Sequence, residues 1–416
     1  MRLLYLGSTD FPQPKARAIQ IVHTCHALAR AGVEVTLVVG RRGGAPPQRA
    51  LRSYGLEPHP LLRLVGVPIL RIPPSAPPRV LRWFTRLWQA SYLVGLVGVL
   101  PGELLGRRPD VVYARDLRTA RLAAGLTHAI GARLGFEVHG LPSFEVREGA
   151  GRAVLPPSAA ARLRSLEAAV FAQADRIVTI TECARRILLE EYGVAAARVR
   201  TVPDGSGVRG KKPARTLEHL PEKAAVYYAG QLYPWKGVGL LIEAATLLPN
   251  VRLVVIGGLP GGRNGVPDPQ LAELGRRADE IGVGARIEFR GYVPYGRVAD
   301  ALRGAAVAVL PLPDEPVARY FTSPLKLFDY MAAGVPIVAS DLPSLREVLC
   351  HGENALLVRP GDAGALALAI ERLLADPALA VRLAARAQRD ADGYTWDARA
   401  ARLIDFFEAG AKSSDG

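Results

Sequence analysis

The sequence predicts an α/β protein with two doubly wound parallel sheets, one in each half of the chain. In both halves, short apolar segments typical of buried strands alternate with segments of helical period, which is the pattern of βαβ units. A length of 416 residues and a hydrophobic fraction of 49% are sufficient for two cores. We therefore expect Rossmann-like domains at residues 1–205 and 224–394, joined by a polar, basic, proline-containing linker at 206–223.

The first half opens with an expected strand at 3–6, which ends at Gly7 and leads into a loop at 8–15. Further strands are expected at 33–39, 110–114, 135–139, 175–181 and 199–203, and helices at 18–29, 118–134, 162–173 and 182–192. Residues 41–78, rich in Gly, Pro and Arg, predict an extended excursion over the surface. Residues 90–105 are apolar but interrupted at Pro101, and are shorter than the ~20 residues that span a bilayer, so we expect a buried or interfacial helix.

The second half repeats the alternation. Strands are expected at 225–230, 251–258, 286–291, 306–311, 335–339 and 355–358, and helices at 237–248, 271–281, 298–304, 342–349, 363–374 and 396–408. One more helix starts at Leu325 and stops at Gly334, with Leu325, Phe328 and Met331 facing the core. The Gly-rich run at 257–265 lacks the G-x-G-x-x-G spacing, so a dinucleotide cofactor is not expected.

Charge and cysteine usage limit the classes of partner. The net charge of +14 favours anionic partners, namely nucleotide diphosphates, anionic lipid surfaces or nucleic acid. Nucleic acid is not expected because no basic tract is interleaved with aromatic residues. The three cysteines form no C-x-x-C pair, and the His residues near Cys25 have no third ligand nearby, so no disulfide framework and no metal site are expected. The chain begins with a strand and not a signal peptide, which predicts a cytoplasmic protein.

The stretch at 323–340 carries the most specific chemistry. A Ser-Pro loop that opens a helix presents the backbone N–H groups of Leu325 and Lys326 at the positive end of the helix dipole, where phosphate binds. Lys326 adds a cation there, and Asp329 adds a carboxylate able to accept from ribose hydroxyls. These groups predict a nucleoside diphosphate site. The alternative interpretation is an ordinary buried helix and strand.

Other candidate residues follow strands at their carboxyl ends, where doubly wound sheets bind ligands. Lys236 and Gly237, at the expected helix start after the strand at 225–230, suit phosphate binding, although an exposed surface lysine is the alternative. His139 ends the strand at 135–139 and Gly7 ends the strand at 3–6, so both are expected in a functional crevice. A structural role is the alternative for His139.

The stretch SPLKLFDYMAAGVPIVAS resembles the donor-site motif of the retaining GT-B glycosyltransferases, the large family that includes sucrose synthases and phosphatidylinositol mannosyltransferases. In that motif Asp329 takes the place of the second Glu, and Phe321 stands where the first Glu is expected. Lys236 matches the family's Lys, and Gln231 lies near its Arg. The resemblance implies two domains facing each other across a cleft, and a helix at 395–410 that crosses back to the first.

The resemblance also implies a donor site and a reaction. The donor-binding residues are expected to be Gly7, Gln231, Lys236, Gly237, Thr322, Ser323, Pro324, Leu325, Lys326 and Asp329, with His139, Lys236 and Asp329 in catalytic roles. The implied reaction is metal-independent and cofactor-free hexosyl transfer from a nucleotide-diphosphate sugar to a glycan or lipid-linked acceptor, with retention, in polysaccharide or glycoconjugate biosynthesis. A nucleotide-sugar epimerase, which would need more carboxylates and histidines in one cleft, and a non-catalytic sugar-nucleotide-binding protein, suggested by Phe321 and Gln231, are the alternatives.

The first half is expected to recognise the acceptor, chiefly through residues 41–105. The aromatic and basic segment at 79–88 and the apolar segment at 90–100 favour, together with the net charge, peripheral contact with an anionic membrane.

Overall fold

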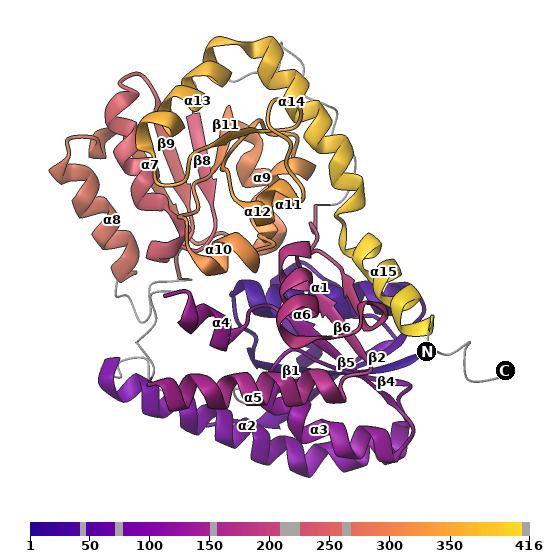
Figure 1. The fold of residues 1–416 in the computed structure, drawn as a ribbon. Coiled ribbons are helices and arrows are strands. Elements are labelled where there is room, and N and C mark those ends of the chain that lie inside the picture. Colours follow the sequence, from indigo (N-terminus) through magenta and orange to yellow (C-terminus); the bar gives the residue numbers. More distant parts are fainter. Residues whose placement is uncertain (42–46, 71–77, 150–155, 209–224, 260–267, 410–416) are drawn as a thin grey trace. The chain divides into compact units, whose positions relative to one another are not determined.

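The computed structural model describes residues 1–41, 47–70, 78–149, 156–208, 225–259 and 268–409. They form two compact units (Figure 1). The first unit contains Met1–Pro203 and the described residues from Arg399 onward, and the second contains Asp204–Ala398. Of the expected linker at 206–223 only the first three residues are described, and most of the Gly-rich run at 257–265 lies outside the described residues.

The first unit contains a parallel sheet of seven strands in the order β3-β2-β1-β4-β5-β6-β7. Its strands are β1 (Arg2–Phe11), β2 (Glu34–Arg41), β3 (Leu62–Pro68), β4 (Val111–Ala114), β5 (Arg133–Val138), β6 (Arg176–Thr179) and β7 (Val199–Thr201). Its helices are α1 (Ala16–Arg30), η1 (Pro47–Tyr54), α2 (Pro78–Arg107), α3 (Leu117–Ala129), α4 (Pro142–Arg147), α5 (Pro157–Gln173), α6 (Glu182–Tyr192) and η2 (Ala196–Arg198). The chain proceeds from β1 outward to β3 and resumes at β4 on the other side of β1. The point where the strand order reverses, called the switch point of the sheet, therefore lies between β1 and β4.

Two predictions for this unit were wrong. β1 continues beyond Gly7, because after a register shift Asp10 and Phe11 pair with the end of β2. The expected surface excursion contains β3, which pairs with β2 along its whole length and so belongs to the sheet. The helix expected at 90–105 is present as part of α2, which continues through Pro101. Pro101 and the residue four positions earlier are both exposed, so water can reach the carbonyl group that loses its helical partner.

The second unit has a six-stranded parallel sheet in the order β10-β9-β8-β11-β12-β13, with its switch point between β8 and β11. The strands are β8 (Ala225–Ala229), β9 (Arg252–Ile256), β10 (Ile287–Gly291), β11 (Val307–Leu310), β12 (Ile337–Ser340) and β13 (Leu356–Val358). The α-helices are α7 (Val238–Ala244), α8 (Pro269–Glu280), α9 (Val298–Ala301), α10 (Pro316–Tyr320), α11 (Leu325–Ala332), α12 (Pro343–Arg346), α13 (Ala363–Ala375), α14 (Pro377–Asp390) and the start of α15 (Trp396–Glu408). The 3-10 segments are η4 (Pro234–Lys236), η5 (Ala245–Leu247), η7 (Gly284–Arg286), η8 (Tyr295–Arg297), η9 (Leu302–Gly304) and η10 (Ala391–Gly393).

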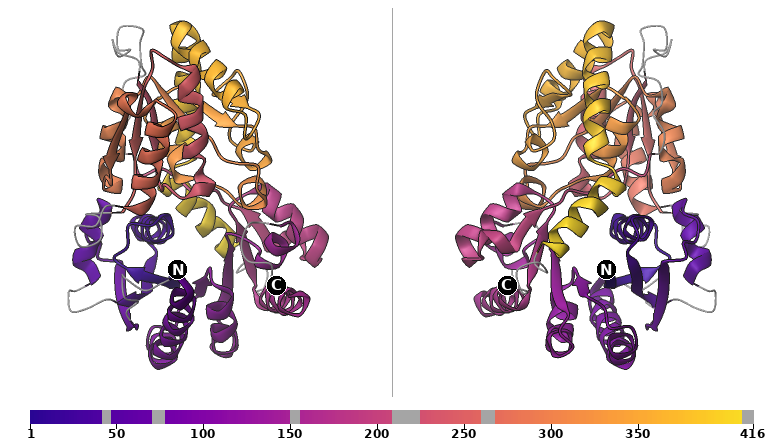
Figure 2. Two further views of the ribbon diagram at one scale, coloured as in Figure 1. Left: turned by 90° about the vertical axis from the view of Figure 1, so that its left-hand side faces the viewer. Right: turned by 90° about the vertical axis from the view of Figure 1, so that its right-hand side faces the viewer.

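Two apolar cores cover the two faces of the second sheet. Along β8, Tyr227 belongs to one core and Tyr228 to the other, as the alternation of side chains in a strand requires. Helices flank both faces of this sheet (Figure 2). Near-continuous burial of β8, β11 and β12 is what a sheet covered on both sides needs.

The predictions for this unit missed two helices. α10 forms inside the expected loop at 312–322, and α14 was not predicted at all. The sequence of α14 is rich in Ala and Arg, and its apolar face becomes evident only from its packing against the second unit's cores. The expected core face of α11 was also partly wrong: Phe328 and Met331 are buried, but Leu325 is only half-buried and Leu327 takes the core position.

Candidate active site

The centre of the candidate site in the second unit is a chain of hydrogen bonds that starts at Lys326. Lys326 Nζ donates to the hydroxyl of Tyr228 at 2.5 Å, and this hydroxyl donates to the backbone carbonyl of Gln231 at 2.6 Å. The ammonium also lies 3.8 Å from the centre of the Tyr228 ring, which is a cation–π distance. Lys326 is in the first turn of α11, after β11, and Gln231 follows β8. The two sides of the switch point are therefore connected through Tyr228.

Two buried lysine amines belong to this site. Burial lowers the pKa of Lys326 well below its usual range, and the charge of Lys236 lowers it further. Burial also lowers the pKa of Lys236. Among the described residues, no carboxylate forms an ion pair with either lysine. Two amines held close together without a carboxylate favour an anion as the missing partner.

Glycines allow the backbone to approach closely around these lysines. Gly237 has a φ of 77°, and a Cβ atom there would lie 1.6 Å from the carbonyl oxygen of Pro311. A Cβ atom on Gly230 would lie 3.0 Å from Nζ of Lys326, and one on Gly257 would lie 1.9 Å from the Gly230 carbonyl oxygen. A side chain at Gly237 or Gly257 would thus displace the backbone that frames the site.

The loop before α11 leaves the start of this helix without a side-chain cap. Pro324 is the N-cap residue and forms no capping hydrogen bond. The hydroxyl of Thr322 donates to the carbonyl of Val317 at 2.8 Å, and Ser323 Oγ accepts from the backbone N–H of Asp204 at 3.0 Å. The predicted donor residues Thr322, Ser323, Pro324, Leu325 and Lys326 therefore lie together, with the first-turn N–H groups of α11 at the positive end of its dipole.

Asp329 lies one turn further along α11 and is only 3% exposed. Its Oδ1 accepts from Ser206 Oγ at 2.7 Å and from the Tyr295 hydroxyl at 3.3 Å. Ser206 in turn accepts from the N–H of Val208 at 3.0 Å, so the carboxylate holds the segment that follows Asp204. Burial raises the pKa of Asp329 to about 7, although the hydrogen bonds from Ser206 and Tyr295 oppose this rise.

His139 belongs to the first unit, where it follows β5. Its Nε2 lies 2.7 Å from Oε1 of Glu137, and its side chain is 18% exposed. Glu137 is fully buried and also accepts from Tyr5 at 3.1 Å, from Gln20 at 2.8 Å and from Arg399. Burial by itself would raise the pKa of Glu137, but the charge of Arg399 and the hydrogen bond with His139 hold it well below its usual range.

These contacts determine which nitrogen of His139 carries the proton. Burial and the charge of Arg115 lower the pKa of His139 to about 4, so the ring is neutral at pH 7. The ionised Glu137 only accepts hydrogen bonds, and therefore Nε2 of His139 is the donor in this pair. Nδ1 then bears the lone pair and is able to accept from a hydroxyl group.

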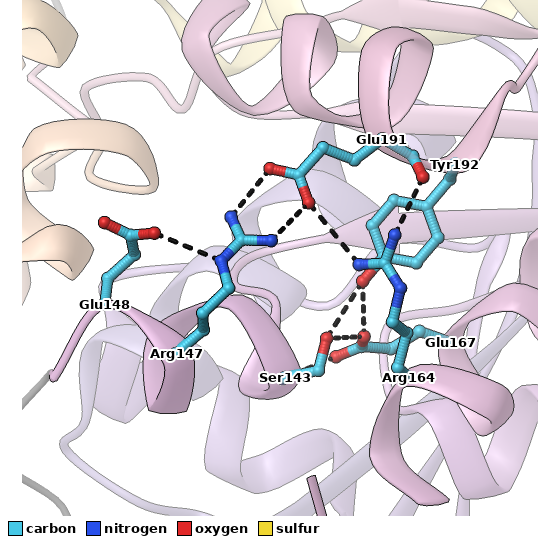
Figure 3. Close-up of polar contacts among 7 residues, drawn as sticks. All are labelled: Ser143, Arg147, Glu148, Arg164, Glu167, Glu191 and Tyr192. Atoms are coloured by element: carbon cyan, nitrogen blue, oxygen red, sulfur yellow. Dashed lines mark hydrogen bonds and ion pairs between the residues drawn. The ribbon is translucent and has the colours of Figure 1, made fainter. Parts of the chain in front are cut away.

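Helix α4, which follows His139 and Gly140, is held by polar contacts to α5 and α6 (Figure 3). The backbone N–H of Ser143 donates to Glu167 at 3.0 Å, and Tyr192 donates to the same carboxylate at 2.6 Å. Arg147 forms two hydrogen bonds with Glu191, at 2.7 and 2.8 Å. This network fixes the backbone on the carboxyl-edge side of β5, from which His139 projects.

Gly7 and Phe321, which the sequence analysis also singled out, are both buried. Gly7 is inside β1, where a Cβ atom would lie 3.1 Å from the Val38 carbonyl oxygen, so its close packing is that of a sheet residue. Phe321, at the position of the first Glu, is buried at 3% exposure. Sequence reasoning missed Tyr228, Ser206, Glu137 and Arg399, because a buried Tyr, Ser or ion pair has no local signal.

Comparison with known proteins shows the family. Residues 213–390 match the model of Glycosyl transferases group 1, and residues 18–205 match that of the Glycosyl transferase 4-like domain. The chain belongs to the group 1 glycosyltransferases. The resemblance that the donor motif indicated is therefore confirmed.

The curated relatives of this glycosyltransferase are similar over different lengths. The D-inositol 3-phosphate glycosyltransferase 1 of Catenulispora acidiphila is 28% identical over 96% of this chain and 91% of its own length. The D-inositol 3-phosphate glycosyltransferase of Acidothermus cellulolyticus is 32% identical over 56% of this chain, and that match spans about half of the relative, at 52%.

Solved structures confirm the predicted GT-B fold with two Rossmann-like domains. Sucrose-phosphate synthase from Thermosynechococcus elongatus aligns with a TM-score of 0.75 at 20% identity, over 99% of this glycosyltransferase and 100% of that chain. Anabaena Alr3699/HepE in complex with UDP and glucose aligns with a TM-score of 0.64 at 17% identity, over 99% of both chains. At these identities the likeness shows the fold alone.

Two further findings concern the described part of this glycosyltransferase. None of its helices there is long and apolar enough to cross a membrane. Its described His, Cys, Asp and Glu side chains form no group of three or more that could hold a metal ion.

Proposed function

We propose that this glycosyltransferase transfers a hexosyl group from a nucleotide-diphosphate sugar to a glycan or lipid-linked acceptor, with retention of anomeric configuration. The observation that carries the proposal is the lysine pair at the switch point of the second sheet. Lys236 and Lys326 present two buried amines without a carboxylate partner among the described residues, next to the uncapped start of α11. A diphosphate provides the negative charge that such a site lacks.

In this proposal the two lysines act on the leaving group. When the bond between the anomeric carbon and the phosphate oxygen breaks, negative charge develops on the diphosphate, and the ammonium groups that Lys236 and Lys326 form beside this anion stabilise it. Tyr228 keeps Lys326 in place through its hydroxyl and ring face. We infer that the reaction needs neither a metal ion nor a cofactor, because the lysines supply the positive charge.

Retention is explained by attack from the face that the phosphate leaves. The acceptor oxygen bonds to the anomeric carbon, and its proton passes to an oxygen of the departing phosphate. A strong protein base is then unnecessary, which agrees with His139, whose pKa of about 4 makes it a weak base. Its Nδ1 is suited to accept from, and thereby position, a hydroxyl group of the donor sugar or acceptor.

Asp329 is still proposed to accept hydrogen bonds from the ribose hydroxyls of the donor. Its carboxylate also accepts hydrogen bonds within the protein, which gives it a second, structural role. Its contacts to Ser206 and Tyr295 support a role in holding the segment after Asp204. Asp is one methylene shorter than the Glu that the family motif has at this place, so the carboxylate reaches less far. Gln231, with its carbonyl fixed by Tyr228, is proposed to contact the donor through its side chain.

The first test is a thermal-shift panel with UDP, GDP and ADP, because a ligand that binds only the native state raises the melting temperature. Radiolabelled sugars of the best nucleotide then test turnover with polyol, glycan and lipid-linked acceptors, and NMR of the product gives the anomeric configuration. An inositol phosphate belongs in the acceptor panel, since the curated relatives are named for it. Treatment with EDTA is expected to leave the rate unchanged.

Variants make this test specific to the lysine pair. Lys236→Ala is expected to abolish turnover and to weaken nucleotide binding by ~1.5–3 kcal/mol, the range for a charge-assisted hydrogen bond. Tyr228→Phe is expected to weaken it less, whereas Tyr227→Phe, on the opposite face of β8, is the control and should bind normally. Unchanged affinity in Lys236→Ala would contradict the diphosphate assignment. Binding without turnover would favour a non-catalytic protein, and formation of an epimer would favour an epimerase.

A further inference from the structure

Helix α2 of the first unit is apolar on two of its sides. One stripe packs inward, and its members are 0–1% exposed: Tyr92, Leu96, Leu100 and Leu104. The helix approaches β3 so closely that a Cβ atom on Gly95 would lie 2.3 Å from Val67. This stripe accounts for the attachment of α2 to its sheet and leaves the opposite side of the helix to be explained.

The opposite side carries a second apolar stripe, which we call the outer stripe. Its large members are Trp83, Leu87, Val94, Val97 and Leu105, with exposed fractions of 65%, 48%, 74%, 55% and 68%. The spacings of 4, 7, 3 and 8 residues keep these side chains on one side of the helix. From Trp83 to Leu105 the stripe extends for roughly 33 Å at the α-helical rise of about 1.5 Å per residue.

The charges around the outer stripe are positive. Arg86, Arg107 and Arg108 are exposed at its ends, and the Arg86 guanidinium lies 5.5 Å from the centre of the Trp83 ring. The sole acidic residue in the sequence of α2 is Glu103. It forms an ion pair with Arg63, and its side chain is 15% exposed, so its charge is already compensated. The stripe therefore combines apolar side chains with uncompensated cations.

We propose that the outer stripe of α2 binds the surface of a membrane that contains anionic lipids. The apolar side chains would enter the boundary between headgroups and acyl chains, while the arginines contact lipid phosphates. Trp83, with its ring beside Arg86, suits the interface, where an aromatic ring meets polar headgroups. Because the inner stripe packs against the first unit along the length of the helix, α2 would lie in the plane of the surface. This inference is independent of the proposed transfer reaction, since none of the residues proposed to act in that reaction belongs to α2.

A second copy of the chain is the competing occupant of the stripe. Two identical outer stripes would bring the same arginines together, which costs electrostatic energy, whereas anionic lipid phosphates attract them. The charge pattern thus favours lipid over self-association. The two occupants also differ in their response to salt, because screening weakens attraction to lipid and relieves repulsion between copies.

The test is co-sedimentation of the full chain with vesicles of phosphatidylcholine alone or mixed with phosphatidylglycerol. The wild type is expected to pellet with the mixed vesicles at least tenfold more tightly than with neutral ones, and to be released as salt rises. The double variant Val94→Ser/Leu105→Ser should lose this binding by tenfold or more while keeping the wild-type melting temperature. Arg86→Glu should weaken binding to anionic vesicles specifically.

A matched control comes from the second unit. Leu247 and Leu368 are 57% and 67% exposed, and Leu247→Ser/Leu368→Ser should bind vesicles as the wild type does. The proposal is overturned if the wild type does not pellet, if neutral vesicles bind it equally well, or if the stripe variant binds unchanged. A concentration-dependent dimer that only the stripe variant abolishes, without vesicle binding by the wild type, would assign the stripe to self-association.

Discussion

At the scale of single residues, the candidate site depends on where protons are held. His139 is neutral and donates from Nε2 to Glu137, which leaves Nδ1 as an acceptor. Lys326 donates a hydrogen bond to the hydroxyl of Tyr228, and Lys236 lowers the pKa of Lys326. For both His139 and Lys326, a buried partner determines which donor or acceptor atom is left for a ligand. The residue type alone does not specify that atom.

His139→Ala is expected to cut turnover by ~10²-fold, because a group that positions a hydroxyl at the reacting centre is lost. Affinity for the free nucleotide, measured by calorimetry, should stay the same. Glu137 keeps the hydrogen bonds from Tyr5, Gln20 and Arg399, so the fold should lose no more than ~1–3 kcal/mol. His139→Gln, which both donates and accepts, should recover part of the rate. Normal turnover by the folded fraction of His139→Ala would show that the histidine is structural.

Asp329 gives a pH dependence with a definite sign. Its pKa in the folded chain is about 7, above the ordinary value of 3.8, so the folded state favours the protonated form. This contribution to stability is complete below about pH 4 and is lost as the pH rises through 7. In Asp329→Asn the loss is absent, so the melting temperature of the wild type should fall relative to that of the variant between pH 4 and 7.

The same variant separates the two roles of Asp329. If the carboxylate binds ribose, Asp329→Asn should weaken nucleotide binding, and a 2′,3′-dideoxynucleotide should bind the wild type more weakly than the parent nucleotide does. Equal binding of both nucleotides to the wild type would leave only the structural role, holding Ser206 and Tyr295.

At the scale of elements, the glycines of α2 show how packing overrides helix propensity. Gly95 lies where a Cβ atom would meet Val67 at 2.3 Å, whereas Gly98 has no atom within 4 Å of that position. Gly95→Ala should therefore destabilise the first unit by ~1–3 kcal/mol through overpacking. Gly98→Ala is the matched control and should stabilise it by up to ~1 kcal/mol, because Ala is the better helix former. Denaturant unfolding measures both, and equal effects would contradict the close approach of α2 to β3.

Some helices and strands can be predicted from the residues within them, and others depend on a distant partner. The boundaries of α6 and α15 were predicted as 182–192 and 396–408, and the structure has the same residues, because apolar period and end signals are local. β3 and the continuous α2 were not predicted. A strand in a Gly- and Pro-rich segment forms because β2 offers it an edge to pair with, and that edge comes from elsewhere in the chain.

At the scale of the whole molecule, the chain returns to the first unit at its end. Arg399 of α15 is fully buried and donates to Glu137, to Thr24 at 3.1 Å and to the carbonyl of Val202 at 2.6 Å. The guanidinium of Arg399 therefore connects α15 to α1, to β5 and to the residue that follows β7. Glu137 and Arg399 are 262 positions apart in the sequence.

Arg399→Met should destabilise the first unit by ~3–5 kcal/mol, because Glu137 is left as a buried, uncompensated charge. Glu137→Gln/Arg399→Met should recover part of this loss. The cores of the second unit contain neither residue, so in calorimetry a transition that belongs to the second unit should not move. A double variant as unstable as the single one would show that the contribution of Arg399 to stability comes from the hydrogen bonds to Thr24 and Val202 and not from the charge pair.

The sequence by itself determined the α/β class, most strands and helices, the family, and the placement of Lys236 and Lys326 after β8 and β11. These features depend on periodicity, on helix and strand ends, and on motif spacing, all of which act over a few residues. Only the tertiary structure decided the partners: Tyr228 for Lys326, Ser206 and Tyr295 for Asp329, Glu137 for His139 and Arg399. Hydrogen bonds and ion pairs between distant residues form because folding excludes water from particular buried groups, and no short stretch of sequence specifies which groups meet.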